Sequence, residues 1–366
     1  MTSAEPPASP EATFARIADL PVKVEGYELE GLEYQAPVGD FERLSTVFRL
    51  RGADQEGIGE DVTYDALDHI ALQGEGPTLP IAGEHTMASF CELVGSLDTF
   101  PSPPERDVSR SYRRWAIESA ALDLALRQAG QSLHGALDLE PSPVTFVCSL
   151  RLVPFGSEEA STADPVLERL AAHPGLRFKL DPTNDWTDGL IAELVATDSV
   201  DSLDLKGQYS GTPVDVETDP ELYSRLIAAF PNAWLEDPDV NDETRAILDA
   251  VADRVTWDAP IHSIADIEAA PWKPRMVNIK PSRFGSLREL FDAYDYCRRE
   301  GIDAYGGGQW ELGPGRGQIQ YLASLFHPDS PNDTAPSGYN TDWQDTALPA
   351  SPLAPEPAAI GFRWGG

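Results

Sequence analysis

The chain has 366 residues, 41% of them hydrophobic, and a formal net charge of −34 from 61 acidic and 27 basic residues. This charge argues against nucleic acid as a partner and disfavours anionic membrane surfaces. No apolar run of about 18 residues is present to span a membrane, and the start, MTSAEPPASPEATFAR, lacks the pattern of a secretory signal. Three widely spaced cysteines argue against a disulfide framework. We therefore expect a cytoplasmic protein that acts on small molecules.

The first part of the chain is typical of a small α+β unit. Residues 1–20 resemble a loose arm, and strand-like stretches follow around 22–32 and 44–50. The second stretch, LSTVFRL, runs into the glycine-punctuated turn RGADQEGIGED, which indicates an antiparallel meander. The segment Ser109–Ala129 is the clearest predicted helix, and Gly130 suits its C-terminal end.

From Val144 onward, strand-like and helical segments alternate seven times, and APSGYN (335–340) is a candidate eighth strand. Such alternation predicts a parallel sheet. We divide the chain into a capping domain (1–143), a barrel (144–340) and a Pro-rich tail (341–366) that runs back over the cap.

Five of the barrel strands end in a charged residue. The segments are RFKLD, SLDLK, AWLED, VTWDA and VNIKP, and their charged positions are Lys179, Asp204, Glu236, Asp258 and Lys280. These positions are 25, 32, 22 and 22 residues apart, which fits one strand–helix unit each in a barrel of about 250 residues. The C-terminal ends of barrel strands form the face that carries catalytic residues. An open sheet would place its site at one switch point rather than on five consecutive strands.

The lysines of this chain are few and concentrated at these strand ends. Only five of the 27 basic residues are lysines, and Lys179, Lys206 and Lys280 lie in the segments above. A GC-rich genome would explain the excess of arginine without any physical cause. Lysine, unlike arginine, can release its proton near neutral pH when its surroundings lower its pKa.

The three acids and two lysines together predict a metal-assisted proton transfer. Oxygens of Asp204, Glu236 and Asp258 suit Mg²⁺, with Mn²⁺ as an alternative. Lys179 and Lys280 flank the acids and could act as general bases. The alternatives are that the acids cap helices or pair with arginines, and that the lysines are simple electrostatic partners.

The chain resembles the enolase superfamily, of the muconate-lactonizing enzyme and o-succinylbenzoate synthase type related to mandelate racemase. The motifs are STVFRLRGADQEGIGED, WAIESAALDLALRQAGQSLHGALD, WLEDP, TWDAP, VNIKPSRFGSL and AYGGGQWELGPGRG. This resemblance implies a modified TIM-type (β/α)7β barrel with an α+β cap formed by the N-terminal region and the tail.

The resemblance also implies an isomerase or lyase that removes a proton α to a carboxylate with Mg²⁺ and a lysine or histidine base. Racemisation, epimerisation, cycloisomerisation and β-elimination are all open, as is a homo-oligomer. Lys179 and Lys280 match the catalytic positions, and Asp204, Glu236 and Asp258 match the metal ligands. Residues expected to bind the carboxylate substrate are Arg177, Lys206, Gln309, Glu311 and Tyr34, the last in the segment GLEYQAPVGD, either a closing loop or a surface linker.

Three positions depart from the pattern of the superfamily. Its Lys-x-Lys on the second strand is matched here by Arg177 and Lys179, unless Asp181 occupies the position of the base. Its Asp-x-Asn on the third strand is Asp204-Leu205-Lys206, and alternation places Lys206 on the same side as Asp204. Ala259 follows Asp258 where many relatives have Glu. An alternative function is therefore a catalytically silent carboxylate-binding protein in which Lys206 replaces the charge of the metal.

Overall fold

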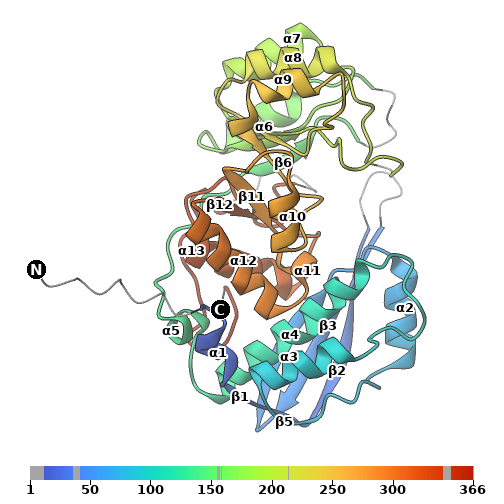
Figure 1. The fold of residues 1–366 in the computed structure, drawn as a ribbon, viewed down its shortest axis with the longest axis vertical. Coiled ribbons are helices and arrows are strands. Elements are labelled where there is room, and N and C mark those ends of the chain that lie inside the picture. Colours follow the sequence, from blue (N-terminus) through green and yellow to red (C-terminus); the bar gives the residue numbers. More distant parts are fainter. Residues whose placement is uncertain are drawn as a thin grey trace, which may run out of the picture.

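The structure of the chain is a computed structural model, and it describes residues 12–35, 42–154, 157, 159–212, 214–340 and 348–365. An α+β part built from the N-terminal region lies beside a barrel of parallel strands (Figure 1). Helices α10 to α13 lie between this N-terminal part and helices α6 to α9 (Figure 1). The predicted fold class, a barrel with an α+β cap, is confirmed.

Antiparallel strands form the sheet of the N-terminal part, as the meander pattern predicts. β2 (Gly26–Gln35), β3 (Glu42–Gly52) and β4 (Gln55–Asp61) pair in chain order, while β1 (Pro21–Val24) pairs with β5 (Gly83–Thr86). The helices of this part are α1 (Ala15–Ala18), α2 (Ala66–Glu75), α3 (Met87–Ser96), α4 (Ser109–Gln128) and α5 (Leu133–Leu137). In the segment GLEYQAPVGD, residues 31–35 belong to β2 and residues 36–40 lie outside the described residues.

Helix α4 packs unusually closely on strand β4. A Cβ atom on Gly57 would lie 2.2 Å from the carbonyl oxygen of Ala120, and one on Gly59 would lie 2.1 Å from that of Ala116. Any larger residue at these two positions would push the strand off the helix, so the glycines of EGIGED are needed for this contact. Gly130, just past the helix, has a φ of 65°, the left-handed conformation typical of helix ends.

Parallel strands form the barrel. They are β6 (Cys148–Arg151), β7 (Phe178–Asp181), β8 (Val200–Asp204), β9 (Trp234–Glu236), β10 (Val255–Thr256), β11 (Met276–Ile279) and β12 (Asp303–Gly306). β6 to β10 pair in chain order, β11 pairs with β12, and a parallel bridge from Trp257 to Val277 joins the two sets.

The eighth position of the barrel is formed by Asn332 and Asp333. Parallel bridges link Asp333 to Gly307 after β12, and Asn332 to Phe146 before β6, so the barrel closes. The prediction of this strand at 335–340 was therefore wrong by a few residues. The Asn332 side chain makes part of the junction, accepting from the amide of Gly306 and donating to the carbonyl of Thr145. Such side-chain pairing leaves no strand pattern in the sequence.

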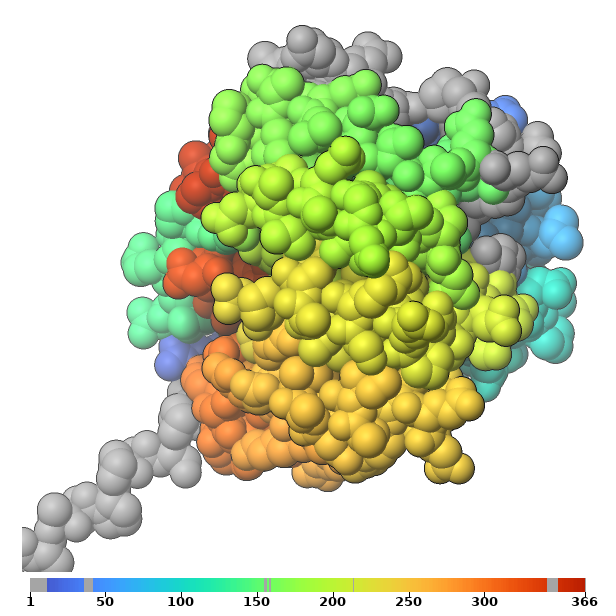
Figure 2. All heavy atoms as spheres, turned by 90° about the horizontal axis from the view of Figure 1, so that it is seen from above, coloured from blue at the N-terminus to red at the C-terminus, as the bar shows by residue number. Residues whose placement is uncertain are grey.

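Helices surround the barrel in chain order, and Figure 2 shows the consecutive units as adjacent bands from green to orange. The helices are α6 (Asp164–Ala172), α7 (Asp188–Ala196), α8 (Pro220–Ala229), α9 (Arg245–Asp249), α10 (Ile264–Ala269), α11 (Pro281–Phe284), α12 (Leu287–Glu300) and α13 (Pro314–Phe326). Among the described residues, no helix is both long and apolar enough to cross a membrane.

The end of the tail contacts the N-terminal part. Asp123 of α4 accepts hydrogen bonds from the amide of Phe362 and from the guanidinium of Arg363, each at 2.8 Å. The ring of Phe362 also packs edge-on against Trp115. The domain boundaries at 143 and 340 stay predictions.

A buried carboxylate joins the two parts of the molecule. Glu60, in β4, is fully buried and accepts hydrogen bonds from the backbone amides of Leu312, Gly313 and Gly315 at 2.7–2.9 Å. The Ser45 hydroxyl adds a fourth hydrogen bond at 2.7 Å. These amides lie at the start of α13, where a negative charge is favourable.

We expect Glu60→Gln to lower the free energy of unfolding by about 2–3 kcal/mol, because the amide removes the charge and turns an NH₂ group toward backbone donors. Chemical denaturation measures the change. Glu56→Gln is the matched control in the same strand, since Glu56 is partly exposed and pairs with Arg49. That substitution should cost less than about 1 kcal/mol. Equal losses for the two variants would contradict the prediction.

Candidate active site and metal centre

The five charged residues predicted from strand spacing come together at one end of the barrel. Lys179 lies within β7, and Asp204 and Glu236 are the last residues of β8 and β9. Lys280 follows β11 directly, and Asp258 lies two residues beyond the end of β10. All five side chains are buried, Lys280 being the most exposed at 6%. In an eight-position barrel, β7 and β11 are the second and sixth strands, so the two lysines approach from opposite sides.

Lys179 is surrounded by carboxylates. Its Nζ pairs with Glu236 and lies 3.4 Å from an oxygen of Asp204 and 3.4 Å from one of Asp333. Burial would lower the pKa of Lys179, but the carboxylates outweigh burial and raise it well above its ordinary value. Lys179 is therefore an ammonium ion in this arrangement.

Glu236 and Asp237 are buried among more acids than bases, which disfavours their charged forms. Burial and the neighbouring acids raise the pKa of Glu236 well above its usual range, although Lys179 opposes them and the Tyr305 hydroxyl donates to its second oxygen. Burial and the charge of Asp258 raise the pKa of Asp237 to about 7. Protons or a cation would relieve this excess.

Asp258 is held by two cations. Its carboxylate accepts from Lys280 Nζ at 2.8 Å, from Arg283 at 2.8 Å and from the Tyr209 hydroxyl at 3.3 Å. Burial alone would raise the pKa of Asp258, but Arg283 and Lys280 lower it below its usual range. Asp258 is thus a carboxylate with its charge already balanced.

Lys206 lies beside Asp204, as predicted. Its Nζ pairs with Asp204 and lies 3.3 Å from Asp181. Despite burial, Lys206 and Lys179 lower the pKa of Asp204 to about 2. Burial raises the pKa of Asp181 to about 6, an effect that Lys206 opposes.

Carboxylates at this site fit a divalent cation. Oxygens of Asp204, Glu236 and Asp237 all lie within 4.8 Å of one another and are buried. Lys179 and Lys206 are linked by ion pairs to four acids: Asp181, Asp204, Glu236 and Asp333. The acids therefore outnumber the two lysines, and hard oxygen donors suit Mg²⁺. The third close acid is Asp237 rather than the predicted Asp258, which Lys280 and Arg283 hold instead.

Of the residues predicted to bind substrate, Arg177 does not join the site. It precedes β7, and its guanidinium pairs with Asp201 and the carbonyl oxygen of Asp198 at the opposite end of the strands. Alternation puts Arg177 on the same side as Lys179, but two residues along a strand separate them by about 6–7 Å. The structure therefore separates Arg177 from the acids.

Gln309 and Glu311 are buried between the barrel and the N-terminal part. The Gln309 side chain accepts from the hydroxyl of Tyr64 at 2.8 Å and donates to that of Tyr112 at 3.3 Å. Glu311 accepts from the amide of Gln309 at 2.6 Å and pairs with Arg316 at 3.3 Å, so it orders its own loop.

Tyr34 is half-buried in β2, opposite Arg43 in strand register.

Five residues that contact the predicted ones in the described part of the site were missed from the sequence: Tyr209, Asp237, Arg283, Tyr305 and Asp333. Asp237 directly follows Glu236 in WLEDP, and Arg283 stands three residues after Lys280 in VNIKPSRFG, so both had a local signal. Asp333 was missed because the eighth strand was placed too late, and Tyr305 because its strand, DAYGGG, has no charged end.

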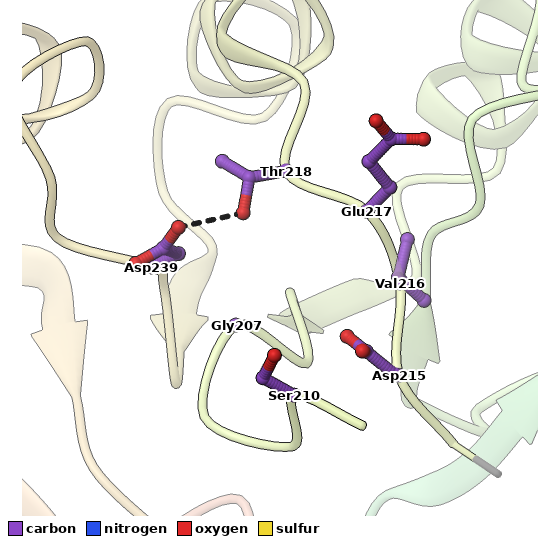
Figure 3. A pocket seen from close by; sticks show the side chains of 7 residues that line it. All are labelled: Gly207, Ser210, Asp215, Val216, Glu217, Thr218 and Asp239. Carbon is purple, nitrogen blue, oxygen red and sulfur yellow. Dashed lines mark hydrogen bonds between the residues drawn. The ribbon is translucent and has the colours of Figure 1, made fainter. Parts of the chain in front are cut away.

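A cavity of about 480 Å³ lies beyond the end of β8, lined by Gly207, Ser210, Asp215, Val216, Glu217, Thr218 and Asp239 (Figure 3). The Thr218 hydroxyl donates to Asp239 at 2.7 Å across it. A Cβ atom on Gly207 would lie 2.1 Å from the amide nitrogen of Asp239, so the turn after Lys206 requires glycine there.

Comparisons with known proteins agree with this architecture. The chain matches the "Domain of unknown function (DUF8230) C-terminal domain" over residues 140–341 and the corresponding N-terminal domain over residues 15–136. It is 26% identical over 228 residues to an o-succinylbenzoate synthase of Geobacillus stearothermophilus, covering 61% of this chain. The match spans 59% of that curated relative.

Solved structures show the same fold over most of the chain. A muconate cycloisomerase from Pseudomonas fluorescens has a TM-score of 0.61 and 16% identity, covering 94% of this chain and 95% of that one. A dipeptide epimerase from Methylococcus capsulatus complexed with Mg ion has a TM-score of 0.60 and 20% identity. The match covers 84% of this chain and 89% of that one. The chain therefore belongs to the DUF8230 family, and its fold is that of the enolase superfamily.

Proposed function

We propose that this protein is an enzyme that binds Mg²⁺ and removes a proton from the carbon next to a substrate carboxylate. The observation that carries the proposal is that acids outnumber their lysine partners here, between lysines from opposite sides of the barrel. Lys179 and Lys206 pair with four acids, of which Asp181, Asp204 and Glu236 are buried and Asp333 is partly exposed. A structural ion-pair network would have no need of excess buried charge, which costs free energy.

Asp204 and Glu236 would hold the metal, and Asp258 or Asp237 would complete the set. Mg²⁺, when bound, supplies positive charge that stabilises the negative charge developing on the substrate. Lys280 would act as general base in its neutral amine form, after releasing its own proton to solvent, and would then accept the α-proton. Lys179, kept protonated by its carboxylates, would act as acid on the opposite face. Two lysines on opposite faces fit racemisation or epimerisation, whereas a purely electrostatic Lys179 fits cycloisomerisation or β-elimination.

The relatives support this proposal without deciding the reaction. The named relatives include a synthase, a cycloisomerase and an epimerase, and the epimerase structure contains Mg ion. We infer that the substrate is a small-molecule carboxylate.

Exchange of the α-proton in D₂O tests the proposal. A set of carboxylic acids is incubated with the protein and Mg²⁺, and deuterium uptake is followed by mass spectrometry. We expect exchange for at least one acid, loss of exchange after EDTA treatment, and recovery with Mg²⁺ or Mn²⁺. EDTA-treated protein that exchanges at the full rate would contradict the role of the metal.

A catalytically silent carboxylate-binding protein is the second candidate, favoured by the ion pair of Lys206 with Asp204. In this case Lys206 replaces the metal. The purified protein would then bind no Mg²⁺ in calorimetry and would exchange no α-proton. Metal binding by the wild-type protein would rule this candidate out.

A further inference from the structure

We propose that the ammonium group of Lys206 pairs with Asp204 until a metal binds there. When the metal binds, the ammonium group moves to Asp181. This inference rests on the proposed metal site. It assigns to this chain a lowered metal affinity, set by competition between its own ammonium group and the ion. Asp181 would act through Lys206 rather than by touching the metal.

The geometry of Lys206 places its amine between two acids. Its Nζ pairs with Asp204 and lies 3.3 Å from Oδ2 of Asp181, so a small change of the side chain would transfer it from one to the other. The backbone amide of Lys206 donates to the other oxygen of Asp204 at 3.2 Å. Both oxygens of this proposed ligand are therefore occupied by one residue.

Asp181 has room for a second bond. Within the described part of the chain, its Oδ1 is buried and has no hydrogen-bond partner. A buried carboxylate oxygen without a donor is unfavourable, and an ammonium group that moves onto Asp181 would remove that cost. The unpartnered oxygen identifies Asp181, rather than bulk water, as the destination of the lysine.

The backbone conformation at Lys206 fixes the direction in which its side chain leaves the chain. Lys206 has a φ of 56°, a left-handed conformation that side-chain-bearing residues rarely adopt. Gly207 follows it in the tight approach to Asp239. The turn thus directs the Lys206 side chain back toward Asp204. A strand that simply continued in an extended conformation would not need this left-handed residue. Strained residues of this kind cluster at functional sites.

Mg²⁺ and Mn²⁺ binding measured by calorimetry on the full-length protein tests the proposal. Lys206→Gln removes the competing charge and should tighten binding at least fivefold. Asp181→Asn removes the receiving charge, so the lysine stays on Asp204 and binding should weaken at least fivefold. In the Lys206→Gln background, Asp181→Asn should change the affinity less than twofold, because no lysine is left to move.

Asp333→Asn is the matched control, since Asp333 pairs with Lys179 and not with Lys206. Its effect on metal affinity should be the same in both backgrounds. An Asp181→Asn effect of equal size in both backgrounds would show simple long-range electrostatics and overturn the proposal. Unchanged affinity in Lys206→Gln alone, a variant whose folding is checked by its melting temperature, would overturn it as well.

Failure of the metal site itself gives a different result. If neither the wild-type protein nor Lys206→Gln bound either ion, the proposed function and this inference would both be wrong. If all variants bound metal with equal affinity, the proposed metal site would be supported and the proposed competition by Lys206 would be wrong. Binding by Lys206→Gln but not by the wild type would support the competition at Asp204 but contradict the proposed function, because Lys206 would then exclude the metal from the natural protein.

Discussion

Lys280→Met is expected to slow α-proton exchange by about 10²–10⁴-fold, the usual contribution of a positioned general base. Lys280 is buried, comes directly after β11 and reaches Asp258 at 2.8 Å. Arg283 still pairs with Asp258 in the variant, so the acid keeps a buried partner and the fold should persist. The exchange rate in D₂O with saturating Mg²⁺ measures the effect, and the melting temperature reports on folding.

Lys273→Met is the control for removing a lysine near the same strand. Its side chain is 65% exposed, donates to the carbonyl oxygen of Glu300 at 3.1 Å and lies 3.4 Å from the Glu300 carboxylate. We expect the exchange rate of this variant to stay within twofold of wild type. If Lys280→Met kept more than a tenth of the wild-type rate, Lys280 would not be the base.

The five predicted positions were found because strand ends repeat along the chain. Asp204, Glu236, Asp258 and Lys280 lie at or just beyond the end of a strand and Lys179 lies within one, and a closed barrel of parallel strands brings these positions together. The prediction that Lys206 would lie beside Asp204 is confirmed by their ion pair, but Lys206 lies beyond β8 with a φ of 56°, so a turn rather than strand alternation places it there. The other inferences need only the period of a strand and the direction of the chain.

The sequence did not predict how far along the barrel axis each side chain lies, or how the loops place their side chains. The Arg177 side chain is on the predicted side of the strand. It lies two residues nearer the N-terminal end than Lys179, where it pairs with Asp201. Asp333 comes from a bridge of two residues that side-chain hydrogen bonds stabilise. Arg283 reaches Asp258 from the turn after Lys280. Each of these placements depends on packing between segments far apart in the chain, which a local pattern does not carry.

Arg113→Met is expected to lower the free energy of unfolding by about 3–5 kcal/mol, as removal of one partner of a buried ion pair does. Arg113 and Asp61 are both fully buried and pair at 2.8 Å. The guanidinium also donates to the carbonyls of Thr99 and Asp68 at 3.1 Å and lies 3.5 Å from the ring of Phe100. The variant leaves the Asp61 carboxylate buried and several backbone acceptors unpaired. Urea denaturation at pH 7 measures the loss.

Arg110→Met provides the matched control on the same helix, α4. Arg110 is 42% exposed and pairs with Asp98 and Asp107 at the surface, so its loss should cost less than about 1 kcal/mol. Similar losses for Arg110→Met and Arg113→Met would show that burial of the pair is not what stabilises the fold.

The pH dependence separates the ion pair from lost packing. Burial raises the pKa of Asp61, but Arg113 and His69 outweigh it and lower the pKa below the ordinary value of 3.8. The stabilisation by this pair is therefore fully present above pH 4 and is lost as the pH falls through the folded-state pKa. In Arg113→Met the unpaired Asp61 binds a proton at higher pH, which removes its burial penalty. The difference between the two proteins should shrink from pH 7 toward pH 4, whereas a pure packing defect would leave it constant.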